Sequence, residues 1–251
     1  MKTIGIDAGS RTVKVVLADG GRPVLSRRKE NSFAVIDVCR ELLEGLQADG
    51  MVATGYGRHL IHEHFGCDEI SEIKAFALGG RAVLPACRTI LDIGGQDFKV
   101  ILLGRNGKVL KFEMNDKCAA GTGRFLEIMS QALGYSTPEF AAAAMSAEKP
   151  AKISSMCTVF AESEVITLAA RGAPRPEVAL GIHHAAVSRV VGMLQRVNVE
   201  REVLFAGGVA LNRCMHELLE AALGQPVQVP DAPEMVGALG CAICCAQRAG
   251  C

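Results

Sequence analysis

The sequence has 251 residues, of which 49% are hydrophobic, and its 27 basic residues are balanced by 27 acidic ones. This length suits one large domain or two lobes, and the apolar content can form a sizeable core. Zero formal net charge, no Trp and only 2 Tyr argue against nucleic acid as a partner. No run approaches the roughly 18 apolar residues of a membrane-spanning helix, and the first residues lack a signal-peptide pattern. We therefore expect a cytoplasmic protein without a membrane partner.

An internal duplication organises the first half of the chain. Residues 7–25 align without a gap to residues 92–110, at a constant offset of 85 residues (92 minus 7). The matched pairs include Asp7 with Asp92, Gly9 with Gly94 and Lys14 with Lys99. In each copy a short apolar strand ends in Asp and a Gly-containing turn, an apolar strand returns, and a third strand follows a second turn. Each copy therefore predicts a three-stranded meander.

Helical patterns follow both meanders. In the first copy we expect a helix over 33–46, a strand over 51–55 and a helix over 71–84. In the second copy we expect a helix from near Ala119, helices over roughly 160–171 and 178–197, and a buried strand over 203–208. A helix over 213–223 and a last helix from near Pro233 complete the chain. We interpret this order as two α/β lobes, 1–88 and 89–251, with a cleft between them and a C-terminal helix able to return to the first lobe.

The Asp/Gly turns have the chemistry of a nucleotide site. Glycine lets backbone N–H groups approach phosphate oxygens, and a strand-end carboxylate can hold a hydrated Mg²⁺. A single such turn is more often a plain β-turn, but two in register favour a clamp on one triphosphate. A third turn, AGGVALN at 206–212, follows a buried strand and precedes a helix. It is suited to the adenosine end of a nucleotide.

These three turns resemble the phosphate 1, phosphate 2 and adenosine motifs of the actin, sugar kinase and Hsp70 superfamily. The segments LDIGGQDFK, MNDKCAAGTGRFLE, MCTVFAESEV and FAGGVALN together resemble the activator ATPases of 2-hydroxyacyl-CoA dehydratases, of the BadF/BadG/BcrA/BcrD type. The resemblance implies a two-lobed, actin-like (ribonuclease H-like) α/β fold with a duplicated βββαβα core and a nucleotide cleft between the lobes.

The resemblance also implies the residues that bind Mg²⁺ and ATP or ADP. Asp7 and Asp92 are expected to hold Mg²⁺ through water, and Gln96 or Asp97 to orient the attacking water, with Gln96 preferred. The nucleotide-binding residues are expected to be Asp7, Ala8, Gly9, Ser10, Arg11, Thr12, Lys14, Asp92, Gly94, Gly95, Gln96, Gly207, Gly208, Val209 and Asn212. Arg11 departs from the family, which usually has a hydroxyl residue there. Glu162 is a further candidate to face the cleft.

The family resemblance gives two cysteines a special role. It implies a homodimer that shares one [4Fe-4S] cluster, with Cys118 and Cys157 of each chain as ligands. Both thiols precede predicted helix starts, where the helix dipole and free N–H groups favour an anionic cluster. Two thiols per chain supply the four ligands that such a cluster needs at a two-fold axis. From position alone, ordinary buried thiols remain the alternative.

The other cysteines and histidines have simpler interpretations. Cys241, Cys244 and Cys245 share one face of a helix, where core packing is favoured over a second metal site near Cys251. Cys39, Cys67, Cys87 and Cys214 have no metal-ligand spacing. His59, His62 and His64 lack acidic or thiol partners at a convincing spacing, so we expect a polar surface there.

The resulting functional expectation is a reductive activator that couples ATP hydrolysis to low-potential, one-electron transfer in an anaerobic setting. Its acceptor is expected to be an iron–sulfur enzyme, a dehydratase or a reductase, and its donor ferredoxin or flavodoxin. The main alternative is a small-molecule kinase of the N-acetylglucosamine kinase type, which shares the superfamily. A nucleotide-gated regulator without turnover is a second alternative.

Overall fold

The computed structural model describes residues 1–31, 33–115, 121–154 and 158–249. The strands are β1 (Lys2–Ala8), β2 (Thr12–Asp19), β3 (Arg22–Glu30), β4 (Gly50–Thr54), β5 (Asp68–Glu69), β6 (Thr89–Ile93), β7 (Phe98–Leu103), β8 (Val109–Asn115), β9 (Val203–Ala206) and β10 (Val227–Gln228). The helices are α1 (Val35–Leu43), α2 (Arg58–Phe65), α3 (Glu72–Val83), α4 (Gly123–Ala132), α5 (Thr137–Met145), α6 (Thr158–Ala170), α7 (Arg175–Val197), α8 (Arg213–Leu223) and α9 (Val236–Ala249), with short 3₁₀ turns η1 (Gly208–Leu211) and η2 (Pro233–Met235).

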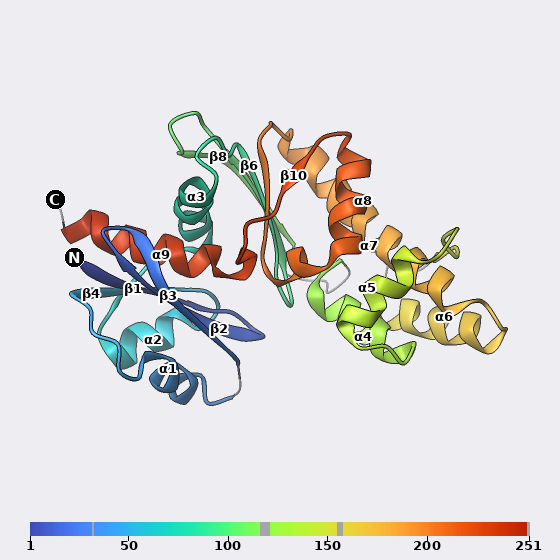
Figure 1. Cartoon of the computed structure of the whole chain (residues 1–251), viewed down its shortest axis with the longest axis horizontal. Helices are drawn as coiled ribbons and strands as arrows, with labels where there is room; N and C mark the ends of the chain where they lie inside the picture. The colour runs from blue at the N-terminus through green and yellow to red at the C-terminus, as the bar shows by residue number, and fades with distance from the viewer. Residues whose placement is uncertain (32, 116–120, 155–157, 250–251) are drawn as a thin grey trace.

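Two five-stranded sheets with the same topology form the framework. The strand orders are β3-β2-β1-β4-β5 and β8-β7-β6-β9-β10. In each sheet the first three strands form an antiparallel meander, and the central strand pairs in parallel with the strand that follows the helical segment. Figure 1 shows the sheets side by side, each with its own helices. The expected duplicated α/β core is therefore confirmed.

The duplication extends to the register of the strands. Asp7 lies opposite Lys14 on β1 and β2, and Asp92 lies opposite Lys99 on β6 and β7. Each meander also carries an irregularity at the equivalent place, between Leu17 and Ala18 and between Leu102 and Leu103. Because a one-residue slip would turn every side chain to the other face, this shared register places both aspartates at matching positions.

Helices cover both faces of the first sheet. Alternate residues of β1, such as Ile4 and Ile6, pack with buried residues of α1 and α2. The opposite face carries Gly5, where a Cβ atom would lie 1.9 Å from the carbonyl oxygen of Ala238 in α9. The missing side chain lets α9 lie directly on the sheet, and Figure 1 shows the C-terminal helix beside β1 and β4. The chain therefore returns to the first sheet at its end.

Helix α3 connects the two halves. It crosses α9 through glycines, since a Cβ on Gly79 would lie 2.0 Å from the Val236 carbonyl oxygen. On its other side, Phe76 and Ala77 belong to a buried cluster with Ile90, Ile101 and Leu204 of the second sheet. The same helix is thus packed against the last helix and against the second sheet, which links the two sheets mechanically.

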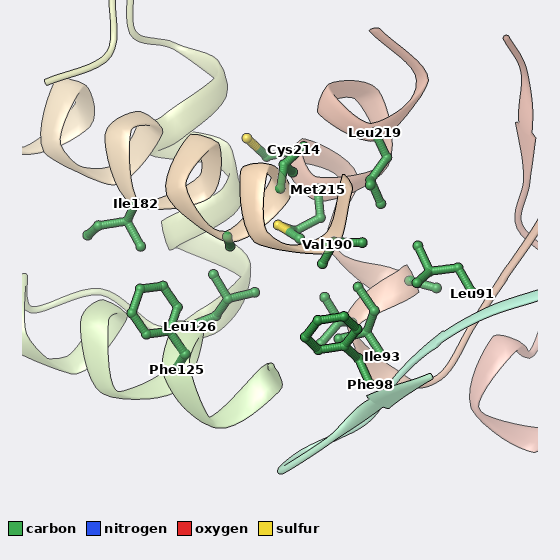
Figure 2. Packing of buried hydrophobic residues seen from close by; sticks show 14 of the residues in the cluster. Leu91, Ile93, Phe98, Phe125, Leu126, Ile182, Val190, Cys214, Met215 and Leu219 are labelled. Carbon is green, nitrogen blue, oxygen red and sulfur yellow. The ribbon is translucent and has the colours of Figure 1, made fainter. Parts of the chain in front are cut away.

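The largest core lies beneath the opposite face of the second sheet. Leu91, Ile93 and Phe98 from β6 and β7 meet α4, α7 and α8, as Figure 2 shows. Phe125 and Leu126 enter this core from α4, and Met215 enters it from α8. Helix α4 is therefore fixed by its apolar face to the lobe that carries the second Asp/Gly turn.

Several elements differ in extent from the sequence-based expectations. Helix α4 begins at Gly123 in the described part of the chain, and residues 116–120, with the expected start near Ala119, lie outside it. Helices α6 and α7 begin two and three residues earlier than expected (158 against 160, 175 against 178). Helices α2 and α5 and the two-residue strands β5 and β10 were not expected. Every helix within the described ranges is too short or too polar to cross a lipid bilayer.

Candidate nucleotide site

A cavity of about 560 Å³ lies where turns from the two sheets meet. Its volume falls in the range of small-molecule sites. The β1–β2 turn contributes Asp7, Gly9, Ser10, Arg11, Thr12 and Lys14; the β6–β7 turn contributes Asp92, Gly94, Gly95, Asp97 and Lys99; the turn after β9 contributes Gly207, Gly208, Val209, Leu211 and Asn212. All three turns singled out in the sequence therefore surround one cavity.

The first turn holds a carboxylate and an ammonium group together. Asp7 is buried, and the Nζ atom of Lys14 lies 3.1 Å from its Oδ2 atom. The two residues are neighbours across the antiparallel strands β1 and β2, which fixes their distance. The turn is closed by a hydrogen bond that the Gly9 N–H donates to the Thr12 carbonyl oxygen. A charged pair is thus held rigidly at the cavity wall.

The second turn has the same arrangement, and its lysine and aspartate are more deeply buried. The Nζ atom of Lys99 lies 3.4 Å from Asp92 Oδ2, 2.6 Å from Asp97 Oδ2 and 2.7 Å from Glu72 Oε2. Burial raises the pKa of Asp92 to about 7, although the positive charge of Lys99 opposes that shift. Burial alone would lower the pKa of Lys99, but its three carboxylate partners outweigh burial and raise it. Lys99 therefore stays charged and neutralises part of an acidic cluster.

The adenosine-type turn leaves open space beside its backbone. Gly207 has φ +83°, and a Cβ atom there would lie 2.4 Å from the Ile93 carbonyl oxygen, so only glycine fits. A Cβ atom on Gly208, by contrast, would have no atom within 4 Å. Gly208 lines the cavity. The backbone is therefore exposed to a ligand at this point.

Asn212 is held in one orientation from two sides. Its Oδ1 atom accepts a hydrogen bond from the Met215 N–H as the N-cap of α8. Its Nδ2 group lies 3.1 Å from Nε2 of the buried His183, whose Nδ1 lies 2.8 Å from the Ala179 carbonyl oxygen. Since a carbonyl oxygen only accepts, Nδ1 carries the proton and Nε2 accepts from Asn212. Burial lowers the pKa of His183 to about 4, so the ring is neutral at pH 7.

Three of the expected site residues stand apart from the cavity. Ala8 is fully buried, and its carbonyl oxygen accepts from the Gly57 N–H; Gln96 is exposed, and neither residue lines the cavity. The third residue, Glu162, is half-buried on α6 and does not line the cavity either. Asp97, by contrast, lines the cavity. Cys118 and Cys157 lie outside the described residues.

Several lining residues were not singled out in the sequence. The duplication gave a reason to expect Lys99 in the site, because it pairs this residue with Lys14. No such signal marked Glu72, because its partner Lys99 is distant in the chain and reaches it only through the packing of α3 on the second sheet. Gly123, in the Gly-rich segment before α4, was a sequence-based candidate for the cleft and lines the cavity. The remaining unexpected lining residues are Arg28, Glu30, Phe76, Arg124, Leu126, Glu127, Thr137, Pro138, Ala141, Leu211 and Glu234.

The other cysteines and histidines of the described residues do not line the cavity. Cys241, Cys244 and Cys245 are buried in one cluster with Val52 and Ile70, as core packing predicts. Burial raises the pKa values of Cys39, Cys67 and Cys87 to about 11, 11 and 12, so these thiols are protonated at pH 7. Within the described ranges, no group of three or more His, Cys, Asp or Glu is arranged to hold a metal ion.

Two lobes of duplicated topology, with Asp/Gly turns around one cavity, are the architecture of the actin and sugar kinase fold class. A glucokinase of the ROK family from Streptomyces griseus shares this fold at 13% identity with a TM-score of 0.64, over 98% of this chain and 100% of that one. Residues 4–245 match the BadF/BadG/BcrA/BcrD ATPase family, and the chain belongs to that family.

Individual relatives of this family are similar over nearly their whole lengths. The 2-hydroxyisocaproyl-CoA dehydratase activator of Clostridioides difficile is 38% identical, over 97% of this chain and 94% of the relative. Its solved structure with bound ADPNP superimposes with a TM-score of 0.92, at 37% identity, over 100% of this chain and 96% of that one. Component A of (R)-2-hydroxyglutaryl-CoA dehydratase from Acidaminococcus fermentans gives a TM-score of 0.94 at 36% identity, with full coverage of both chains.

Proposed function

We propose that this protein is an ATP-dependent reductive activator that drives one-electron transfer to an iron–sulfur enzyme. The observation that carries the proposal is the pair of Asp–Lys turns, which have the same register and line one cavity. Membership of an ATPase family supports the nucleotide, and two relatives named as dehydratase activators support the coupled role.

The cavity fits a magnesium nucleotide. Asp7 and Asp92 would hold the metal through its water ligands, because Mg²⁺ retains several waters and prefers carboxylate oxygens. Lys14 and Lys99 keep positive charge beside both carboxylates, which suits a polyphosphate. The open space beside Gly208 suits the sugar, and Asn212 is fixed at the same wall for the base end. The Mg²⁺ ion would neutralise charge on the phosphates during transfer.

The residue that orients the attacking water lies in the β6–β7 turn. Asp97 lines the cavity and is held by Lys99 at 2.6 Å, whereas the exposed Gln96 would have to turn inward to reach a phosphate. Phosphoryl transfer depends mainly on positioning and on charge stabilisation, so a fixed carboxylate can orient an attacking water without accepting its proton early. We therefore place Asp97 before Gln96 in this role.

The redox part of the proposal depends on Cys118 and Cys157. The seven cysteines in the described ranges are buried and unpaired, and their burial inside packed cores makes them poor cluster ligands. Two thiols per chain, at a homodimer axis, provide the four thiolates of a [4Fe-4S] cluster, which would supply one-electron transfer. The acceptor is then a dehydratase or reductase with its own iron–sulfur centre, and a cytoplasmic ferredoxin or flavodoxin is the donor.

The coupling can be tested with anaerobically purified protein. A reduced sample is mixed with an iron–sulfur dehydratase of the relatives' type, and reduction of the dehydratase is followed by EPR with ATP or with a non-hydrolysable analogue. Reduction that needs hydrolysable ATP supports the proposal. ATP hydrolysis stimulated by a sugar substrate, with no electron transfer, would establish the kinase alternative. Nucleotide binding without turnover would establish a regulator.

A further inference from the structure

One arginine of the first turn reaches across the cleft to the second lobe. Arg11 donates through its Nη2 atom to Glu127 Oε1 at 2.6 Å. Arg11 belongs to the β1–β2 turn, and Glu127 lies on α4, which is packed into the core of the other lobe. Both residues line the cavity. The ion pair therefore joins the two lobes at the mouth of the nucleotide site.

The stem of Arg11 is packed between the two phosphate turns. A Cβ atom built on Gly95 would lie 2.3 Å from Arg11 Cγ and 3.5 Å from Ser10 Oγ. The arginine stem thus lies directly on the backbone of the second turn, and a side chain at position 95 would displace it. Because Arg11 lines the same cavity as both glycine turns, a triphosphate held by those turns would lie beside this side chain.

Arg11 can pair with Glu127 or with a phosphate, and the stronger of these two contacts determines its partner. The side chains of Arg11 and Glu127 are 48% and 24% exposed, and an ion pair so exposed contributes little to stability because solvent screens it. A phosphate carries more charge and accepts two parallel hydrogen bonds from a guanidinium, which makes the contact stronger. Glu127 would also keep a partner, because Arg124 Nη1 lies 3.0 Å from its Oε2 atom. The exchange leaves no carboxylate unpaired.

We propose that Arg11 makes the site selective for triphosphate over diphosphate by exchanging Glu127 for the terminal phosphate. The proposal rests on the proposed nucleotide site and names a residue that discriminates between its ligands. The N-terminus of α4 stays attached to the second turn, since Gly123 N–H and Arg124 N–H donate to the carbonyl oxygens of Gly94 and Gly95. Exchange of the Arg11 contact therefore removes a link between α4 and the first lobe while its link to the second remains.

The test compares affinities for ADP and for a non-hydrolysable ATP analogue by calorimetry with magnesium present. Arg11→Ser should weaken analogue binding about tenfold and change ADP binding little, since one charge-assisted contact is lost. Arg11→Lys should recover part of the loss. Glu127→Gln should strengthen analogue binding about two- to fivefold, because it removes the competing partner. In the Arg11→Ser background, Glu127→Gln should have no effect.

Matched controls separate this inference from the proposed site itself. Arg40→Ser removes an exposed arginine that pairs with Asp37 on α1, away from the cavity, and should change neither affinity. Equal weakening of ADP and analogue by Arg11→Ser, or weaker analogue binding in Glu127→Gln, would overturn the role of Arg11. Failure of the wild-type protein to bind either nucleotide would instead overturn the proposed function.

Discussion

Each of the two Asp/Gly turns is built around one aspartate and one lysine that face each other across adjacent strands. Asp7 and Lys14 form the first pair and Asp92 and Lys99 the second, with the same register in both sheets. Around Lys99 the environment is more acidic, because Asp97 and Glu72 also contact its ammonium group. The two halves are therefore alike in geometry and unequal in charge.

Removing either aspartate should stop hydrolysis without unfolding the protein. In Asp7→Asn and Asp92→Asn the carboxamide keeps the shape of the side chain but loses the charge that would hold hydrated Mg²⁺. We expect ATP hydrolysis to fall by at least two orders of magnitude, in line with the loss of a charge-stabilising group. Steady-state phosphate release and a thermal melt check both parts. Wild-type turnover in either variant would contradict the assignment.

Filling the open space at Gly208 should abolish nucleotide binding. A valine there meets no protein atom within 4 Å of its Cβ, so the fold should tolerate it while the side chain occupies the cavity. Gly192→Val is the control, because that helical glycine is exposed, equally free of neighbours and not part of the cavity lining. Calorimetry with ADP should show lost binding in Gly208→Val alone. Unchanged ADP affinity in Gly208→Val would place the ligand elsewhere.

The neutral His183 predicts a loss of stability in acid. Burial lowers its pKa from 6.5 to about 4, so the unfolded chain binds the proton more readily than the folded chain does. The stabilising contribution is complete above pH 6.5 and disappears as pH falls towards 4, by about 3 kcal/mol in total. Urea unfolding of the wild type and of His183→Gln, at pH 7 and 4.5, measures the difference. Equal pH dependence in both proteins would show that His183 does not cause it.

At the scale of elements, the crossing of α3 and α9 holds the two halves together. A Cβ atom on Gly240 would lie 1.8 Å from the Ala75 carbonyl oxygen and 2.9 Å from the Gly79 nitrogen. These contacts are with backbone, which cannot move aside as a flexible side chain can. The close approach of the two helices therefore requires glycine at this position.

Gly240→Ala should destabilise the protein by about 1–3 kcal/mol or more, because the helices must separate to admit the methyl group. Gly192→Ala provides the matched control on an exposed part of α7, where alanine should stabilise the helix by up to about 1 kcal/mol. Chemical denaturation of the two variants gives both free energies. A free energy of unfolding for Gly240→Ala that is no lower than that of the wild type would mean that the crossing adjusts without strain.

Elements with a strong local signal were predictable from the sequence, and those without one were not. The meanders and the long α7 follow from their apolar patterns. Helix α5 had a signal that the apolar pattern did not reveal, since Ser136 and Glu139 form a capping box. Helix α2 buries only Ile61 and carries three histidines, so its pattern is typical of a polar loop. The two-residue strands β5 and β10 exist only through pairing with β4 and β9.

At the scale of the molecule, the duplication predicted that the matching turns meet, and both of them line one cavity. Contacts across the lobes could not be predicted in this way. Glu72 reaches Lys99 through the packing of α3, and Glu127 reaches Arg11 through the position of α4. Such pairs depend on how the lobes meet, which no local pattern encodes. The division of the chain at residue 88 stays a prediction, and α3 lies against parts of both halves.

The central claim is that the nucleotide-binding chain carries an electron-transferring cluster shared between two copies. Iron analysis of the anaerobically purified dimer, beside Cys118→Ser, tests it most directly. The account predicts about four irons per dimer, as a shared four-thiolate cluster requires, and loss of iron in the variant with ADP binding retained. About four irons per chain, or no iron after anaerobic reconstitution, would contradict it.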